Sequence, residues 1–505
     1  MAQQILIREF RLEGVTLVSQ EQLQAELAQF RDKEYTFAGL GRITNAVTAF
    51  YASQGLVARA LFPPQDIEDG VIRIRVIEGK LGEVRIDNQG ERARTGIIRG
   101  FVRHRMEKGE PVDLEALGET LNILNDQPGV TVSSSLGSGD SEGLVNLRVT
   151  SRDKPAMTFS ASVSNQGSRA TGEAQAVASA TSHNPSGNFD LGTLLYSKTE
   201  GSNFLLADYS RAVGYSGLRL GGNLSRLDYE VTQDSLRGSG SRGDAGTLGL
   251  NAYYPLYRLR LFSLALTGLV ERKNLEDFTF AGEVGDRVVM TSGLGFTTSA
   301  QDDFLSGGLT SLNATFFYGD SDQRNDSARL QDATTRQAFS DFTKITYALR
   351  RQQQLVPLWI LDIDLRGQFA FDNLDSSERF SLGGVNGVRA YPSGEAGGDE
   401  GHILSVNLVK QFPGSVTATL FADSGYIRDN HELWAGWNAA DPDQENTYRL
   451  SGYGTSLDWA ISSHFSLSAI VAKPIGNNPG RDATGNDSDG RNQDLRGWVS
   501  LVSQF

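Results

Sequence analysis

The clearest strand pattern in the chain is Leu361–Phe371, which reads Leu-Asp-Ile-Asp-Leu-Arg-Gly-Gln-Phe-Ala-Phe. Its large apolar residues share one face of an extended chain, and Asp362, Asp364, Arg366 and Gln368 share the other. A strand that separates lipid from water has this character. A soluble sandwich also alternates, with its apolar face inward, so this stretch alone leaves both architectures open.

The same alternation recurs from about residue 154 to the end of the chain, as in Phe159, Ala161 and Val163. Aromatic residues gather near strand ends, as at 253–257 and 316–318, in the way that interfacial girdles do. The last strand-like run, from Trp498, ends in Phe505, a common feature of bacterial outer-membrane barrels. These features favour a transmembrane barrel over a sandwich.

Connections in this region are of two kinds, long polar loops and short turns such as 412–414. The long loops are expected at 232–246, 320–338, 428–447 and 476–494. Outer-membrane barrels have this asymmetry between their two rims. Residues 154–505 would give sixteen antiparallel strands about 22 residues each, enough for a spanning strand of ~9–11 residues and a connection.

Composition excludes several classes of protein. The 505 residues carry a formal net charge of −14, which argues against nucleic acid as the main partner. There is no cysteine, hence no disulfide, thiolate nucleophile or cysteine metal site. No stretch approaches the ~18 apolar residues of a spanning helix. No signal peptide is visible before the first strand-like run, which predicts a mature or trimmed form.

The first 150 residues predict two copies of a β-α-α-β-β unit, an α+β organisation. In the first copy, a strand at 5–10 precedes a helix opened by Ser19 and a second helix over 40–50. Strands at 56–61 and 71–77 complete it. The second copy repeats this order with a strand at 84–86, helices at 97–102 and 114–124, and strands at 130–136 and 143–149. Two unrelated α+β modules are the alternative.

A glycine-rich segment, 383–401, lies between two good strands and contains Val388-Arg389-Ala390-Tyr391. Downstream, Phe421-Ala422-Asp423 is followed by Gly425. With these motifs the chain resembles the outer-membrane transporters of two-partner secretion, the TpsB family of the Omp85 superfamily. In that family a Val-Arg-Gly-Tyr-like tetrad lies on a loop folded into the barrel lumen, and a Phe-x-Asp motif lies on a nearby strand. Ala390 departs from the usual glycine.

The resemblance implies two periplasmic POTRA domains, at 1–79 and 80–153, followed by a barrel over 154–505 with an inward-folded loop at about 376–402. A long loop inside a pore needs an anchor, because holding flexible chain in place costs entropy. Arg389 offers a planar fork of donors and Asp423 a matching carboxylate. The alternative is a solvated loop arginine and an ordinary turn aspartate.

The function implied by the resemblance is a non-enzymatic pore in the outer membrane of a Gram-negative bacterium, without a cofactor or a metal. The POTRA domains would capture an unfolded partner exoprotein, such as an adhesin, a cytolysin or a contact-dependent toxin. The partners expected are this exoprotein and outer-membrane lipid, with no nucleic acid, and the pore is expected to be a monomer. Family members often carry an N-terminal plug helix; about four residues precede the first strand here, so we expect it to be missing or removed.

Capture is expected to use β-augmentation, in which the edge strand of a sheet pairs with an extended substrate. The candidate edge is the strand near 130–136, with Val130, Val132 and Ser134 as candidate substrate-binding residues. Two other functions stay open. One is an Omp85-type factor that assembles other barrels, which usually has more POTRA units. The other is a passive porin or a surface-binding barrel.

Three further patterns have some features of functional sites. Residues 139–143 fit the G-x-S-x-G pattern of serine hydrolases, but they are expected in a hairpin turn and not in a strand–helix elbow. The five histidines have no metal-ligand spacing. The loop 486–490 suggests calcium, yet Gly485 and Arg496 stand where an EF-hand needs acidic residues. We therefore expect no metal.

Overall fold

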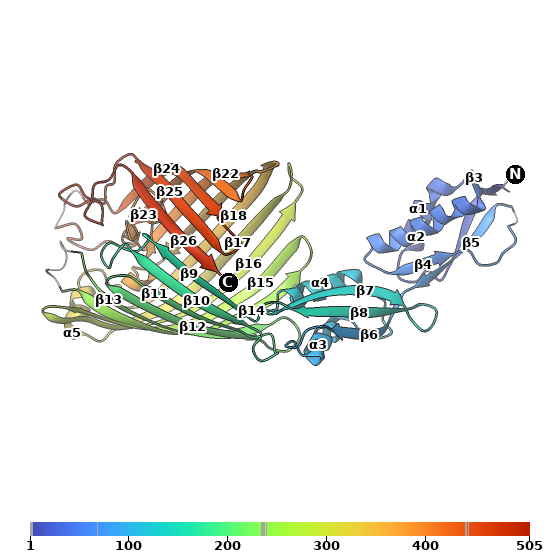
Figure 1. Ribbon diagram of the computed structural model, residues 1–505, viewed down its shortest axis with the longest axis horizontal. Coiled ribbons are helices and arrows are strands. Elements are labelled where there is room, and N and C mark those ends of the chain that lie inside the picture. Colours follow the sequence, from blue (N-terminus) through green and yellow to red (C-terminus); the bar gives the residue numbers. More distant parts are fainter. Residues whose placement is uncertain (1–3, 68, 234–237, 239, 440–441, 443) are drawn as a thin grey trace.

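The structure is a computed structural model that describes residues 4–67, 69–233, 238, 240–439, 442 and 444–505. Two small α+β units extend from one end of a large closed barrel (Figure 1). Among the residues that the structure describes, no helix has both the length and the apolar character needed to cross a membrane.

Sixteen strands, each paired antiparallel with its neighbours, close the barrel, as the sequence predicts. The first eleven are β9 (Met157–Ser164), β10 (Gln175–His183), β11 (Leu191–Lys198), β12 (Ser202–Ala212), β13 (Arg219–Glu230), β14 (Arg242–Arg258), β15 (Phe262–Thr279), β16 (Gly282–Asp302), β17 (Gly308–Gln323), β18 (Asp341–Val356) and β19 (Trp359–Ala370). The last five are β22 (Glu400–Phe412), β23 (Val416–Arg428), β24 (Thr447–Ala460), β25 (Phe465–Ile475) and β26 (Arg496–Gln504). Pairing of β26 with β9 completes the cylinder.

Alternating residues separate the two faces of the wall. On β23, Leu420 is 60% exposed on the outside, whereas Phe421 and Asp423 are buried inside. The apolar face of β19 likewise ends at exposed Phe369, and Gln368 points inward. A barrel embedded in lipid requires this arrangement, with an apolar outer surface and a polar interior.

The two rims differ as predicted. The rim far from the α+β units carries the long connections, among them 324–340, with helix α5 (Asp326–Ala333), and 476–495 (Figure 1). The near rim carries short turns, such as 357–358 and 413–415. Two predicted loops were too long, because β14 already begins at Arg242 and β17 runs to Gln323. Residues 234–237, 239, 440–441 and 443 of the predicted loops lie outside the described residues.

The first α+β unit has more strands than predicted. Its elements are β1 (Gln4–Ile7), β2 (Glu9–Glu13), α1 (Gln20–Leu27), β3 (Lys33–Thr36), α2 (Gly41–Ser53), β4 (Ala58–Leu61) and β5 (Val71–Glu78). The single strand expected at 5–10 is wrong: β1 pairs with β3, and β2 pairs with β5. The chain changes partner at Arg8, where the amides of Arg8 and Glu9 both donate to the Gly70 carbonyl oxygen. Ser19 caps α1 by accepting from the Gln22 amide, as predicted.

The second unit has the predicted β-α-α-β-β order. It comprises β6 (Lys80–Asn88), α3 (Thr95–Arg105), α4 (Leu114–Asn125), β7 (Val130–Ser138) and β8 (Leu144–Asp153). The sheet order β6-β8-β7 leaves β7 at an edge, again as predicted. The G-x-S-x-G segment is the hairpin turn between β7 and β8, which is not the setting of a catalytic serine.

The second unit shares its hydrophobic core with the near rim of the barrel. Phe101 of α3 packs edge-on against Phe189 of turn 184–190 and Tyr215 of turn 213–218, with ring centroids 5.7 and 5.9 Å apart. Arg258 at the end of β14 makes a bidentate ion pair with Asp126 at 2.6 and 2.9 Å. These contacts fix the unit to the barrel. The first unit meets the second through main-chain hydrogen bonds from Val112 to Gly79 and from Leu114 to Gly55, and through the Val57 side chain, which packs against the second unit's core.

Candidate functional site

The connection between β19 and β22, residues 371–399, folds back into the barrel, and we call it the lumen loop. It contains a short 3-10 turn (Ser376–Glu378) and a small ribbon of β20 (Phe380–Ser381) and β21 (Gly397–Gly398). Val388 and Tyr391 of this loop are fully buried among the inward-facing Ile403, Phe421 and Leu450 of the wall. The glycine-rich segment therefore lies inside the pore, where the sequence predicts it.

Arg389 and Asp423 form the contact that the motifs predict. The Arg389 Nε and Nη2 atoms donate to Asp423 Oδ2 and Oδ1 at 2.9 and 2.7 Å, and the Arg389 amide also donates to Oδ2 at 3.1 Å. The Asp423 side chain is fully buried and that of Arg389 is 13% exposed. Three bonds to one carboxylate from a single residue make this a rigid, charge-assisted clasp.

Three neighbours complete the seat of Arg389: Phe421 of the predicted motif, and Asn407 and Trp498, which sequence reasoning missed. Asn407 of β22 accepts from Nη2 at 2.8 Å, and the Phe421 ring lies 3.4 Å below the guanidinium carbon. The Trp498 indole on β26 donates to the Arg389 carbonyl oxygen at 2.9 Å. Alternation already places Asn407 on the same face as Ile403, but only register shows that β22 pairs it with Phe421.

Two glycines in the wall make room for the loop. A Cβ at Gly425 would come within 2.9 Å of Val388, and one at Gly452 within 2.5 Å of the Ala390 methyl group. The predicted Gly425 is thus a close-approach position. The sequence does not single out Gly452. Its missing side chain leaves room for the methyl group of Ala390, which the glycine usual at position 390 in the family lacks.

A second set of ion pairs holds the start of the lumen loop, and these pairs involve different barrel strands from those that contact the tetrad. Glu378, which is 4% exposed, forms ion pairs with Lys273 of β15 at 2.6 Å and with Lys344 of β18 at 2.8 Å. Arg287 of β16 pairs with Asp375 at 2.7 Å. The loop is therefore tied to strands β15, β16 and β18 before it reaches β22 and β23.

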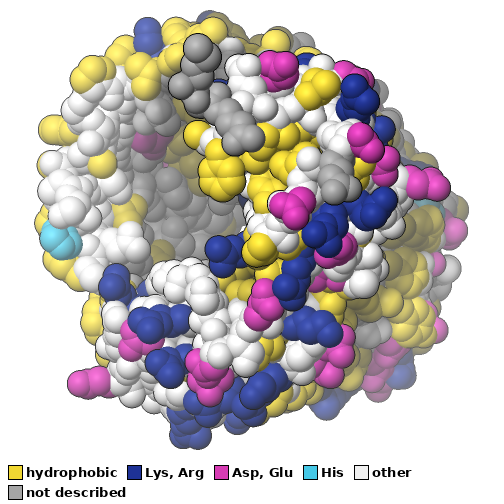
Figure 2. Space-filling view, turned by 90° about the vertical axis from the view of Figure 1, so that its right-hand side faces the viewer, with side chains coloured by type: hydrophobic (Ala, Val, Ile, Leu, Met, Phe, Trp, Pro, Cys, Tyr) yellow, Lys and Arg dark blue, Asp and Glu magenta, His cyan; other side chains and the backbone are white. Residues whose placement is uncertain are grey.

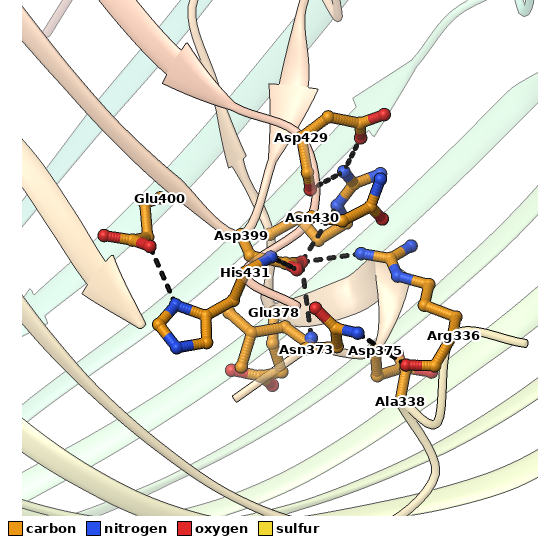
Figure 3. Close-up of polar contacts among 12 residues, drawn as sticks. Arg336, Ala338, Asn373, Asp375, Glu378, Asp399, Glu400, Asp429, Asn430 and His431 are labelled. Carbon is orange, nitrogen blue, oxygen red and sulfur yellow. Dashed lines mark hydrogen bonds and ion pairs between the residues drawn. The ribbon is translucent and has the colours of Figure 1, made fainter. Parts of the chain in front are cut away.

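A third set ties the end of the lumen loop to the neighbouring outer loops (Figure 3). Buried Asp399 accepts from Arg336 of loop 324–340 at 2.6 Å and from the His431 amide of loop 429–446 at 2.9 Å. Asn373 donates to the Arg336 carbonyl oxygen at 2.6 Å. These contacts join three long connections across the far rim.

Loop 476–495 closes over the middle of the lumen loop. Glu395, 1% exposed, accepts from the Asn478 side chain and from the Ser488 amide, both at 2.7 Å. Segment 486–490, where the sequence argues against an EF-hand calcium site, contributes the Ser488 amide to a carboxylate of this chain. The lumen loop is held by polar contacts along its whole length.

The candidate substrate-binding residues lie apart from the lumen, on β7. The side chains of Val130 and Val132 are buried in the core of the second unit and are not available to a substrate. The Val132 amide and carbonyl groups are both bonded to the Asn125 side chain, at 2.8 and 3.0 Å. Since main-chain groups alternate in direction along a strand, Ser134 faces its own amide and carbonyl toward the open edge.

A closed sixteen-stranded barrel with an anchored lumen loop and α+β units at one rim defines a class of outer-membrane transporters. Residues 5–79 match the ShlB-type POTRA domain. Residues 143–453 match the haemolysin secretion/activation protein ShlB/FhaC/HecB family. This match covers more than half of the chain, and the chain belongs to this family.

Relatives and solved structures agree with this assignment. The heme/hemopexin transporter protein HuxB of Haemophilus influenzae is 26% identical over 495 residues, covering 96% of this chain and 84% of HuxB. The outer membrane transporter CdiB of Escherichia coli is 26% identical over 490 residues, covering 91% and 80%. The structure of E. coli CdiB matches with a TM-score of 0.74 at 21% identity, covering 100% of this chain and 91% of CdiB.

BamA from Haemophilus ducreyi, lacking POTRA domains 1–3, has a TM-score of 0.57 at 15% identity, covering 99% of this chain and all of that one, a likeness of fold. The protein is an outer-membrane pore of two-partner secretion, with periplasmic POTRA domains and a partner exoprotein as cargo. The family match supports this function over the assembly factor.

Proposed function

We propose that the lumen loop is the gate of the pore and that the Arg389–Asp423 clasp holds it shut. The observation that carries this proposal is that Arg389 donates three hydrogen bonds to one buried carboxylate, that of Asp423. Breaking a fully buried ion pair costs about 3–5 kcal/mol, and less where water reaches both charges. An arriving polypeptide and lumen water would replace these polar contacts at moderate cost, which suits a gate that opens repeatedly.

Replacing Arg389 tests this gate. We expect Arg389→Ala to raise the basal conductance of the pore in planar bilayers and to reduce secretion of the exoprotein. Arg366→Ala, a charge loss on β19, is the matched control and should leave both near wild type. The exchange Arg389→Asp/Asp423→Arg should recover part of the effect. Unchanged conductance and secretion in Arg389→Ala would refute the role of the clasp.

The exoprotein is captured by main-chain pairing at β7. Ser134 supports this proposal because it lies at the open edge of the sheet, where an extended chain of almost any sequence finds donors and acceptors. The buried side chains of Val130 and Val132 position this edge and do not contact cargo. Deleting residues 1–153 separates this function from that of a porin, because only a passive pore would keep its function.

The pore acts as a monomer and without an enzymatic step; folding of the exported chain outside the cell supplies direction. Its cargo belongs to the exoproteins of two-partner secretion, with an adhesin, a cytolysin or a contact-dependent toxin as candidates. The name of the relative HuxB adds a protein concerned with heme or hemopexin. Co-expression with one candidate of each kind, followed by assay of the medium and the cell surface, identifies the cargo.

A further inference from the structure

A groove of about 390 Å³ runs between the edge strand β6 and helix α3 of the second POTRA domain. Its lining includes four cations, Arg85, Arg99, Arg103 and Lys108, and a single acid, Glu83. Arg99 and Arg103 are four residues apart on α3, so they project from one face of the helix. A local excess of positive charge is unusual in a chain whose net charge is −14.

These cations are nearly all without partners. Within the part of the chain that the structure describes, Arg99, Arg103 and Lys108 make no hydrogen bond or ion pair, and Arg85 lies only 3.7 Å from Glu83, with both side chains largely exposed. In contrast, Arg389 in the lumen is held by the Asp423 carboxylate. Unpaired cations that converge on one groove form a site for an anion from outside the chain.

The groove lies at the level where the membrane begins. Helix α3 contacts turn 213–218 through Phe101, and a Cβ on Gly100 would meet the Tyr215 ring. Tyr215 itself is 44% exposed, and the strand that follows this turn presents exposed Leu220 to lipid. Arg99 and Arg103 lie on the face of the same helix that is turned away from Phe101, so the groove opens on the side of α3 that this turn leaves uncovered.

The views of the whole molecule agree with this placement. Helix α3 lies just beyond the near rim, below the barrel wall (Figure 1). Seen from the end that carries the POTRA domains, Lys and Arg side chains gather along the lower margin, the height at which α3 and β6 lie (Figure 2). This part of the second POTRA domain therefore lies at the periphery of the molecule, just beyond the near rim of the barrel.

We propose that the groove binds the phosphate headgroups of anionic phospholipids in the inner leaflet of the outer membrane. Guanidinium groups match a phosphate in shape as well as in charge. Each basic residue near an anionic lipid surface contributes about a fivefold gain in affinity. An acidic segment of the exoprotein is the competing ligand, but nothing would fix such a segment at the membrane rim.

The full-length protein in lipid nanodiscs tests the proposal. The chain has no cysteine, so Gly96→Cys, which lies on α3 in open space, accepts a single fluorophore beside the groove. Its quenching by nitroxide-labelled phosphatidylglycerol is compared with quenching by labelled phosphatidylethanolamine at equal mole fraction. We expect phosphatidylglycerol to be enriched about fivefold or more at this position. The enrichment should fall as salt is added.

In Arg99→Glu/Arg103→Glu the enrichment should disappear. Arg11→Glu/Arg73→Glu, an equal charge change on exposed residues of the first POTRA domain, should keep it. A fluorophore at Gly118→Cys, on α4, reports whether any enrichment is general to the rim. Equal quenching by the two lipids, or full enrichment in Arg99→Glu/Arg103→Glu, overturns the proposal. So does loss of exoprotein binding in that variant with lipid enrichment unchanged.

Discussion

Ala390 and Gly452 face each other with no space for a second methyl group. We predict that Gly452→Ala displaces the tetrad, because a Cβ there would lie 2.5 Å from the Ala390 methyl group, and overpacking of this kind costs about 1–3 kcal/mol. The expected result is faster proteolysis of the lumen loop and a higher basal conductance. Ala390→Gly in the same chain should restore both values. A double variant no better than Gly452→Ala would contradict the steric explanation.

Glu78 makes the first POTRA domain sensitive to acid. Burial raises the pKa of its carboxyl group, but hydrogen bonds from the Thr16 side chain and amide, the Leu17 amide and the Tyr51 hydroxyl outweigh this effect and lower the pKa. A lowered pKa stabilises the fold above the unfolded value of about 4.3, and this stabilisation is lost as pH falls through the folded value.

We therefore predict that the free energy of local opening at Thr16 and Leu17 decreases as pH is lowered through this range. Hydrogen exchange, corrected for intrinsic rates, measures it. Glu78→Gln should show the weaker protection already at pH 7 and little further change with acid. Glu9→Gln, on an exposed glutamate of the same domain, is the control. Equal pH dependence in wild type and Glu78→Gln would contradict the assignment.

The sequence locates the two ends of the clasp but not its surroundings. Arg389 and Asp423 stand in short motifs that can be recognised locally. Asn407, Gly452 and Trp498 stand in ordinary strands, and each contacts the tetrad only because strand register and closure of the barrel bring it there. Contacts set by register between distant segments are not encoded in any short pattern.

Among the elements, β7 has the most direct functional consequence. Asn125 already occupies both main-chain groups of Val132, so the free part of the edge begins at Ser134. We predict that Ser134→Pro removes one outward donor without breaking the β7–β8 ladder, and that exoprotein binding falls about fivefold or more. Ser134→Ala keeps the amide and should bind normally. Binding affinity and circular dichroism together distinguish loss of the donor from loss of fold.

The elements also show where periodicity is insufficient. Helices α2, α3 and α4 were predicted from apolar stripes, and their buried residues, such as Ile43 and Leu117, lie where expected. The strand at 5–10 was predicted as one element because nothing in its alternation marks Arg8. Its division follows from two different partners in two sheets: β3 pairs antiparallel with β1, and β5 pairs parallel with β2. Strand pairing is a tertiary property, and short strands carry little local signal.

At the scale of the whole molecule, the junction between the two POTRA domains differs from the junction between the second POTRA domain and the barrel. The second POTRA domain and the barrel share a hydrophobic core around Phe101 and Phe189. The first domain is joined to the second by main-chain hydrogen bonds, the exposed Arg75–Glu142 pair and a single partly buried apolar side chain, Val57. We predict a broad distance distribution across the first junction and a narrow one across the second. Nitroxide pairs at Phe37→Cys/Gly137→Cys and Gly137→Cys/Phe304→Cys, measured by double electron–electron resonance, give both. Equally narrow distributions would contradict this difference.

The shared aromatic core has a mechanical consequence. We expect an exoprotein that pulls on the first POTRA domain to bend the joint at Gly79 first. Tension reaches the turns of the near rim only after that joint is fully extended. The second POTRA domain then stays fixed to the barrel, and the first POTRA domain can change its orientation as it binds cargo without disturbing the closed channel.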